Sequence, residues 1–255
     1  MNRLLFVCTL TALPIAASAQ QQDASRWGIG AGAAAIDSPY AGEDIRIRPI
    51  PLLSYEGERF FLRGPTGGYH FIDTPAFSFD FIGAARLDGF DIEDLGVDEL
   101  AARGVDRRLL EDRDDQLDAG LGLSWRGDFG ELQLRAVTDI TDTSGGQEVS
   151  LTYSYRMQMG LFTVTPLVGV SYLSADLADY YYGILDEEVS RGVADYKPGA
   201  AVAPQAGVNF MRPFGEHWAL MGSVRYVLLP DEFSDSPLIE SDSSASLFLG
   251  LTYRF

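Results

Sequence analysis

The chain has 255 residues, 46% of them hydrophobic and 12% aromatic, and its formal net charge is −18. A protein this acidic repels phosphate backbones, which argues against nucleic acid as a partner. Its single cysteine, Cys8, lies near the start, so residues 20–255 contain no disulfide, thiol nucleophile or cysteine metal site.

Residues 1–19 predict a cleaved secretory signal peptide. Arg3 gives a positive start, an apolar run extends from Leu4 to Ala17, and Ala17-Ser18-Ala19 has the small-residue spacing of a cleavage site. The apolar run is too short to be a membrane-spanning helix. We therefore expect export, and we expect residues 20–255 to form a single domain.

From residue 27 onward, apolar and polar side chains alternate with a period of two, which is typical of strands. The predicted strands are 27–35, 45–55, 59–71, 77–87, 117–125, 131–136, 148–158, 162–172, 202–210, 218–228 and 244–255. Closed single-chain bacterial barrels have an even number of strands, so this odd set points to an error in the Gly- and Pro-interrupted stretch 56–76. The sequence predicts twelve strands, with ten as the alternative.

The final segment gives the strongest indication of a membrane barrel. In residues 244–255, Leu247, Leu249 and Leu251 alternate with small or polar residues and continue to Tyr253 and Phe255. The segment has the length that a membrane-spanning strand needs, about 9–11 residues. Its aromatic end is similar to the assembly signal of outer-membrane barrels, so we expect outer-membrane lipid and the barrel assembly machinery as partners. The alternative is an edge strand of a soluble sandwich.

Long and short connections alternate along the chain. The predicted long loops are 88–116, with a short helix near 98–110, then 140–147, 175–198 and 229–243; the predicted short turns are 126–128, 159–161 and 212–216. Outer-membrane barrels place long loops outside the cell and short turns in the periplasm. The sequence therefore predicts an all-β, transmembrane, antiparallel up-and-down barrel in the cell outer membrane.

Charged residues of both signs lie on the predicted inward phase of the strands. They are Arg46, Arg48, Asp80, Arg86, Asp118, Glu131, Arg135, Glu148, Arg156 and Arg225. Because unpaired buried charge is costly, this mixture predicts a charge network that fills a narrow lumen. The alternative is a small pore whose charged walls select solutes.

Catalytic constellations are not evident in the sequence. A serine nucleophile needs a histidine within hydrogen-bond reach, and the chain has two histidines, His70 and His217, which we interpret as solvated turn residues. Histidine spacing typical of metal sites is also missing. We expect no catalytic residue, no metal and no cofactor.

Pro49 and Pro51 are a further feature of the second predicted strand. Residues two apart point their N–H groups at the same neighbouring strand, and proline has no N–H. We expect a loosened seam beside this strand, where a partner or lipid is held.

Several motifs resemble those of one family, the MltA-interacting protein (MipA/OmpV) family of outer-membrane proteins. They are 39–44 (P-Y-A-G-E-D) followed by 49–51 (P-I-P), 180–183 (Y-Y-Y-G) with Glu187 and 196–198 (Y-K-P), 236–238 (S-P-L), and the closing 250–255 (G-L-T-Y-R-F). The resemblance covers nearly the whole chain after the signal peptide and implies an outer-membrane barrel. The family's name-giving member is described as a scaffold that joins a murein lytic transglycosylase to a murein synthase.

This resemblance favours a non-catalytic scaffold for the cell-wall (peptidoglycan) machinery. The alternative is a narrow channel or binding barrel for small solutes, and a lipid-modifying barrel enzyme is least favoured. Tyrosine offers a large contact area with a polar tip, so tyrosines of the loops are candidate contacts for a ligand or partner. These are Tyr40, Tyr180, Tyr181, Tyr182 and Tyr196. Alternatively, Tyr180, Tyr181 and Tyr182 brace their loop against the barrel mouth.

Overall fold

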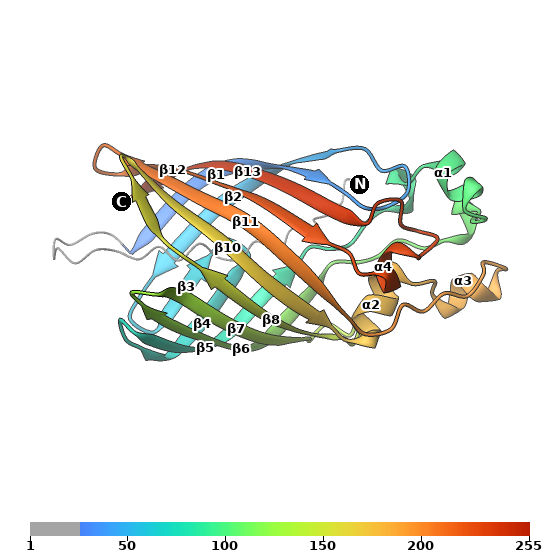
Figure 1. Cartoon of the computed structure of the whole chain (residues 1–255), viewed down its shortest axis with the longest axis horizontal. Helices are drawn as coiled ribbons and strands as arrows, with labels where there is room; N and C mark the ends of the chain where they lie inside the picture. The colour runs from blue at the N-terminus through green and yellow to red at the C-terminus, as the bar shows by residue number, and fades with distance from the viewer. Residues whose placement is uncertain (1–25) are drawn as a thin grey trace.

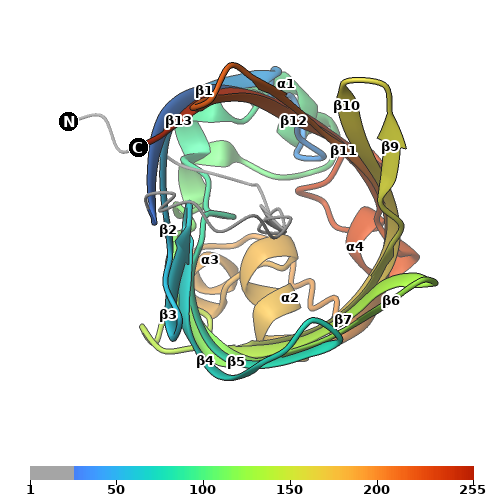
Figure 2. The same cartoon turned by 90° about the vertical axis from the view of Figure 1, so that its left-hand side faces the viewer.

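The computed structural model describes residues 26–255, which form a closed antiparallel barrel with several short helices at one end (Figures 1 and 2). The strands are β1 Trp27–Asp37, β2 Arg46–Glu56, β3 Phe60–Arg63, β4 Thr66–Asp73, β5 Phe77–Arg86, β6 Gln116–Gly127, β7 Gly130–Asp139, β8 Gln147–Ser154, β9 Met157–Met159, β10 Phe162–Leu173, β11 Ala201–Phe214, β12 Trp218–Leu228 and β13 Ser243–Arg254. The last strand, β13, pairs with β1 and closes the barrel.

The barrel is twelve-stranded, because β8 and β9 are two parts of one strand. Both pair with β10 in the same register, Ser154 opposite Leu167 and Met157 opposite Val164. The short interruption lies near Pro166 of β10, which has no N–H to donate. The predicted count of twelve is confirmed.

The ambiguous stretch 56–76 contains two strands where the sequence analysis placed one. β3 and β4 form a hairpin whose tip is Gly64-Pro65, and Gly64 has a φ of +59°, which glycine adopts readily. β3 has only four residues, fewer than a membrane-spanning strand requires. Short length and broken alternation are the reasons that the pattern reads as one irregular strand.

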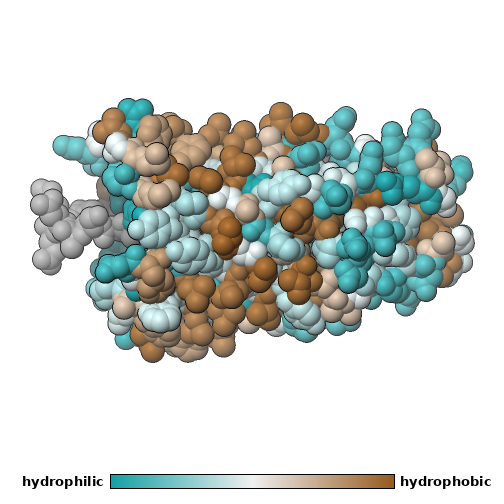
Figure 3. Space-filling view, viewed as in Figure 1, coloured by the Kyte–Doolittle hydropathy of each residue, from teal (hydrophilic) through white to brown (hydrophobic). Residues whose placement is uncertain are grey.

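Alternation between an apolar outer face and a mixed inner face agrees with the prediction. On β13, Leu247, Leu249 and Leu251 are exposed, whereas Phe248 and Gly250 are buried. On β2, Ile47 and Leu53 point outward and Arg48 is buried. Hydrophobic residues gather over the strands in Figure 3, and hydrophilic residues dominate the end that carries the helices.

The two ends of the barrel differ as predicted. The short turns between β2 and β3, β4 and β5, β6 and β7, β9 and β10, and β11 and β12 lie at the end that also carries Phe255, here called the turn end. The long connections lie at the opposite, loop end, which is extracellular in barrels of this kind. They contain η1 Ile92–Asp94, α1 Val97–Ala102, η2 Arg107–Leu109, α2 Ala175–Tyr182, α3 Asp186–Ser190 and α4 Asp231–Ser234.

The helix predicted near 98–110 is present as α1 followed by η2, whereas α2, α3 and α4 were predicted as loop. Over residues 26–255, no helix combines the length and the apolar character needed to cross a membrane. The predicted signal peptide falls on residues outside the described range and stays a prediction.

The strand that carries Pro49 and Pro51 is paired unequally on its two sides. β2 pairs with β1 without interruption from Arg46 to Tyr55. On its other side, within the described part of the chain, β2 pairs with β3 only over residues 54–56. Leu53 accepts one further bond from Gly64, so the wall is open to hydrogen bonding beside residues 46–52, as the prolines predicted.

Candidate functional site

The loop end of the barrel is closed by a packed assembly that we call the cap, made of residues 38–45, 87–115, 174–200 and 229–242. Seen from the turn end in Figure 2, its helices lie across the far mouth of the barrel. Its buried core is apolar and draws on all four segments: Tyr40, Ala41, Phe90, Leu95, Leu100, Val105, Leu110, Ala178, Ile184, Val193, Leu229, Phe233, Leu238 and Ile239. Burial of this area holds the long connections in one arrangement.

A fully buried ion pair joins two of the cap segments. The side chains of Arg113 and Glu188 are both completely inaccessible to solvent. Each of the two Arg113 Nη atoms lies 2.9 Å from a carboxylate oxygen of Glu188. Arg113 also donates to the backbone oxygens of Tyr180 and Gly183. Glu188 accepts from the backbone N–H groups of Glu111 and Leu185. These bonds satisfy both charges, as burial demands.

The candidate tyrosines lie within the cap, and their contacts favour bracing. The Tyr40 hydroxyl donates to the Tyr181 backbone oxygen at 3.0 Å. The Tyr181 side chain is only 2% exposed and donates to the Asp114 oxygen. Tyr182 stacks on Phe233 with ring centroids 4.4 Å apart.

Tyr180 and Tyr196 brace neighbouring segments in the same way. The Tyr180 hydroxyl accepts from the Asp114 N–H, and the Tyr196 hydroxyl donates to the Glu232 oxygen. Burial raises the pKa of Tyr40, Tyr181 and Tyr182, because the phenolate would lose its hydration. Tyr40, Tyr181 and Tyr182 also line a cavity of about 100 Å³ beneath the cap, and this cavity is where a ligand would contact them.

Arg86 lies at the centre of the charge network in the lumen. Its guanidinium bonds Asp118 at 2.8 Å, Glu148 at 2.5 Å and Asp88 at 3.0 Å, and Gln116 donates to Asp118. One cation on β5 thus faces three carboxylates, which come from β6, from β8 and from the loop that follows β5. Burial raises the pKa of Asp88 even though Arg86 acts in the opposite direction.

The other predicted lumen charges form separate contacts and not one continuous network. Arg46 pairs with Glu43, Asp80 with His70, Glu131 with Arg126, and Arg225 with Gln205. Arg48 is buried, Arg135 lines a small cavity with Arg86 and Glu148, and Arg156 lines the cavity at the turn end.

The interpretation of His70 as a solvated turn residue is wrong. His70 lies on β4, is 6% exposed, stacks on Phe61 and bonds Asp80 at 2.6 Å through Nδ1. Ser78 donates to the same carboxylate, so the aspartate stands between serine and histidine. That order does not provide a base for a serine nucleophile. His217, in contrast, is an exposed turn residue beside Tyr253.

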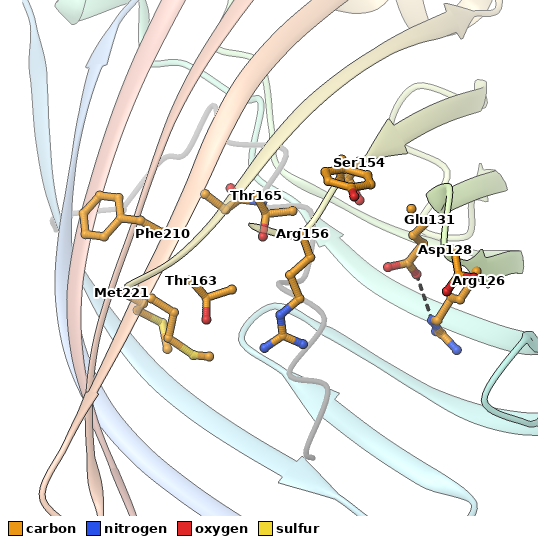
Figure 4. Close-up of a pocket in the computed structure, with 14 residues that line it drawn as sticks. Arg126, Asp128, Glu131, Ser154, Arg156, Thr163, Thr165, Phe210 and Met221 are labelled. Atoms are coloured by element: carbon orange, nitrogen blue, oxygen red, sulfur yellow. Dashed lines mark hydrogen bonds and ion pairs between the residues drawn. The ribbon is translucent and has the colours of Figure 1, made fainter. Parts of the chain in front are cut away.

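A cavity of about 370 Å³, here called the vestibule, lies at the turn end (Figure 4). Its lining contains Arg126, Asp128, Glu131 and Ser154 on one side, with Thr163, Thr165, Phe210 and Met221 on the other. Arg156 extends into it from the break between β8 and β9, while Arg126 is held by Glu131 at 3.1 Å. The vestibule offers charged, hydroxyl and apolar groups to a ligand that arrives from the turn end.

A metal centre finds no support in the described residues, because His, Cys, Asp and Glu side chains do not gather there in groups of three or more. Sequence reasoning missed Arg113, Glu188 and Arg126. Glu188 lies in the stretch 175–198 that was predicted as a long loop, and nothing in its sequence neighbourhood marks it as buried.

A closed twelve-stranded antiparallel barrel, apolar on its outer face and with long loops at one end, is the architecture of an outer-membrane protein. The family model described as MltA-interacting protein MipA matches residues 29–255. The chain therefore belongs to the MltA-interacting protein family, and the resemblance inferred from its motifs is confirmed.

Two relatives from Escherichia coli agree with this assignment. The chain is 35% identical to the "Putative outer membrane protein YiaT" of Escherichia coli K12, covering 98% of both chains. It is 30% identical to the "MltA-interacting protein" of the same strain, covering 90% of both chains. The structure of the NanC porin matches with a TM-score of 0.48 at 8% identity, covering 89% of this chain and 100% of the porin. The protein is an outer-membrane barrel, as predicted, and these relatives carry no enzyme-type name.

Proposed function

We propose that this protein is a non-catalytic outer-membrane scaffold that holds a periplasmic murein lytic transglycosylase through its turn end. The observation that carries the proposal is the asymmetry of the lumen. The cap lies across the loop end with the Arg86 cluster beneath it, whereas the vestibule lies at the turn end. A barrel that is covered on its outward side and accessible from its inward side suits a protein whose partner lies in the periplasm.

The relative named MltA-interacting protein supports the identity of the partner. Murein synthase is a second expected partner, implied by the family resemblance alone. The tyrosines of the cap are poor candidates for this contact, because the periplasm lies at the opposite end. Arg156 and the turn residues Asp128, Gly160 and Glu216 are better placed.

Site-specific photocrosslinking in intact cells tests the proposal. A photoreactive residue placed at Asp128, Gly160 or Glu216 should capture a lytic transglycosylase, and one placed at Glu187 in the cap should not. Arg156→Glu should reduce capture severalfold without changing the barrel's abundance. Capture from Glu187 alone, or from none of these positions, would contradict the scaffold role.

A further inference from the structure

Along much of its length, β2 has a strand partner on one side only, and two prolines of β2 lie along the side without a partner. The β3–β4 hairpin ends at Gly64-Pro65, where Gly64 donates to the Leu53 oxygen and Ala85 donates to the Pro65 oxygen. Beyond that tip, β2 continues to Arg46 with no ladder partner on that side among the described residues. The resulting gap in the wall lies between β2 and the end of β5.

Pro49 and Pro51 prevent a strand from filling this edge. Leu53 accepts its bond from the hairpin side, and alternate residues of a strand present their backbone groups to the same neighbour. Pro49 and Pro51 therefore face the unpaired side. Since neither has an N–H, a strand added here would lose half of its ladder bonds at these positions, so β-augmentation is disfavoured.

An apolar pocket lies directly behind the edge. Ile50 and Leu52 of β2 point inward and pack with Phe248 and Met221, whereas much of the lumen elsewhere is polar. Gly250 makes this possible: a Cβ there would lie 2.7 Å from Phe248 and 2.8 Å from Leu52. The pocket has a volume of about 90 Å³.

One residue of the pocket lining also lies on the outer surface of the barrel. Leu53 lines it and is also 45% exposed on the outer face, which in an outer-membrane barrel meets lipid. Gly64 and Pro65, at the tip of the β3–β4 hairpin, line the pocket on the turn-end side of the gap. Leu87, which follows β5, packs against the apolar cluster and is only partly buried.

We propose that this gap is a lateral site that admits a hydrocarbon chain of a membrane lipid into the apolar pocket, with Leu87 as its movable cover. The prolines disfavour an added strand. Ile50, Leu52, Met221 and Phe248 give most of the pocket an apolar surface that favours a hydrocarbon chain over a polar solute, and the polar side chains Ser54, Arg63, Thr252 and Arg254 also line it. The lipid that surrounds the barrel supplies the remaining candidate, and transfer of methylene groups between two apolar surroundings costs little.

The test uses the refolded full barrel in vesicles of dioleoylphosphatidylcholine. The photoreactive residue p-benzoylphenylalanine replaces Ile50 in the pocket, Ile47 on the outer face, or Leu167, which is inward and buried on a strand paired on both sides. After irradiation, intact mass should show a one-lipid adduct at positions 50 and 47, and background at 167. The heat-dependent shift on gels establishes that each variant is folded.

Substitutions of Leu87 distinguish a lipid chain that enters the pocket from one that only lies near it. Leu87→Phe should lower the adduct at position 50 severalfold, and Leu87→Ala should raise it, while the adduct at position 47 stays constant. Equal adducts at positions 50 and 167 would overturn the proposal, as would an adduct at position 50 that ignores both Leu87 substitutions. If the label at position 50 prevents folding, the same comparison at Met221 decides the question.

Discussion

At the scale of single residues, the cap depends on a few side chains with many partners. Arg113 serves one carboxylate and three backbone oxygens, and its guanidinium also lies over the Phe90 ring, 5.5 Å from the centroid. Glu188 is similarly saturated. Because these groups are buried, each bond lost leaves a partner unsatisfied, so small changes here have large effects.

Arg113→Met should open the cap. Removing one partner of a buried ion pair costs about 3–5 kcal/mol, because the remaining charge is left without compensation. We expect rapid chymotrypsin cleavage near Tyr180 in the variant and slow cleavage in the parent. The control is Glu111→Gln, which breaks the exposed pair with Arg191 and should cost less than about 1 kcal/mol. Equal cleavage of the two variants would contradict the role of Arg113.

The buried tyrosines predict a pH limit for the cap. Their pKa values are raised above the ordinary value of about 10, since burial disfavours the phenolate. Below pH about 10 the three hydroxyls are protonated in the folded and in the unfolded chain, so the cap has its full stability. Above pH about 10 the unfolded chain loses these protons first, so the stability of the cap falls as the pH rises towards the folded pKa values.

Tyrosinate absorbance checks this expectation. Part of the signal should develop well above pH 10 and coincide with protease sensitivity of the cap. Replacing Tyr40, Tyr181 and Tyr182 with phenylalanine should remove that late fraction. If the triple variant retains it, other tyrosines are responsible.

At the scale of elements, each strand has a lipid-facing and a lumen-facing set. Leu151 of β8 points outward and Thr152 points inward. Leu151→Arg should cost about 2–4 kcal/mol if it lies near the bilayer midplane, and Thr152→Arg should cost much less. Urea unfolding in vesicles measures both, and the reverse order would mean that the faces are exchanged.

The pair Leu249 and Gly250 on β13 is less suitable for the same comparison. Leu249→Arg tests the outer face in the same way. Gly250→Arg, however, would force a Cβ against Phe248 and Leu52, so its cost reflects steric overlap and not only the direction of the side chain.

The strands could be predicted from the sequence because period-two alternation is a local property. β13 and β2 have their predicted faces, and the predicted boundaries differ by only a few residues. β3 was not predicted as a separate strand, because four residues are too few to show a period of two. The cap and the His70–Asp80 contact depend on partners distant in sequence, such as Arg113 with Glu188, which no local pattern reveals.

At the scale of the whole molecule, the cap lies across one end of the barrel and the vestibule lies at the other. In planar bilayers we expect the intact barrel to show no steady conductance, because we infer that the cap and the Arg86 cluster obstruct the passage of ions at the loop end. Deleting residues 175–198, which carry α2 and α3, should produce open events. Steady conductance of the intact barrel would favour the channel over the scaffold.

The pairing of β1 with β13 sets the order in which the molecule can form. These strands come from opposite ends of the described chain, yet they share an uninterrupted register from Gly28 opposite Arg254 to Asp37 opposite Ala245. Such non-local pairing is slow, because a long loop must close before the contact is gained. Until then the sheet has two free edges and is prone to aggregate. We therefore expect the β1–β13 seam to be the last contact to form, and we expect the two free edges to need shielding until it has formed.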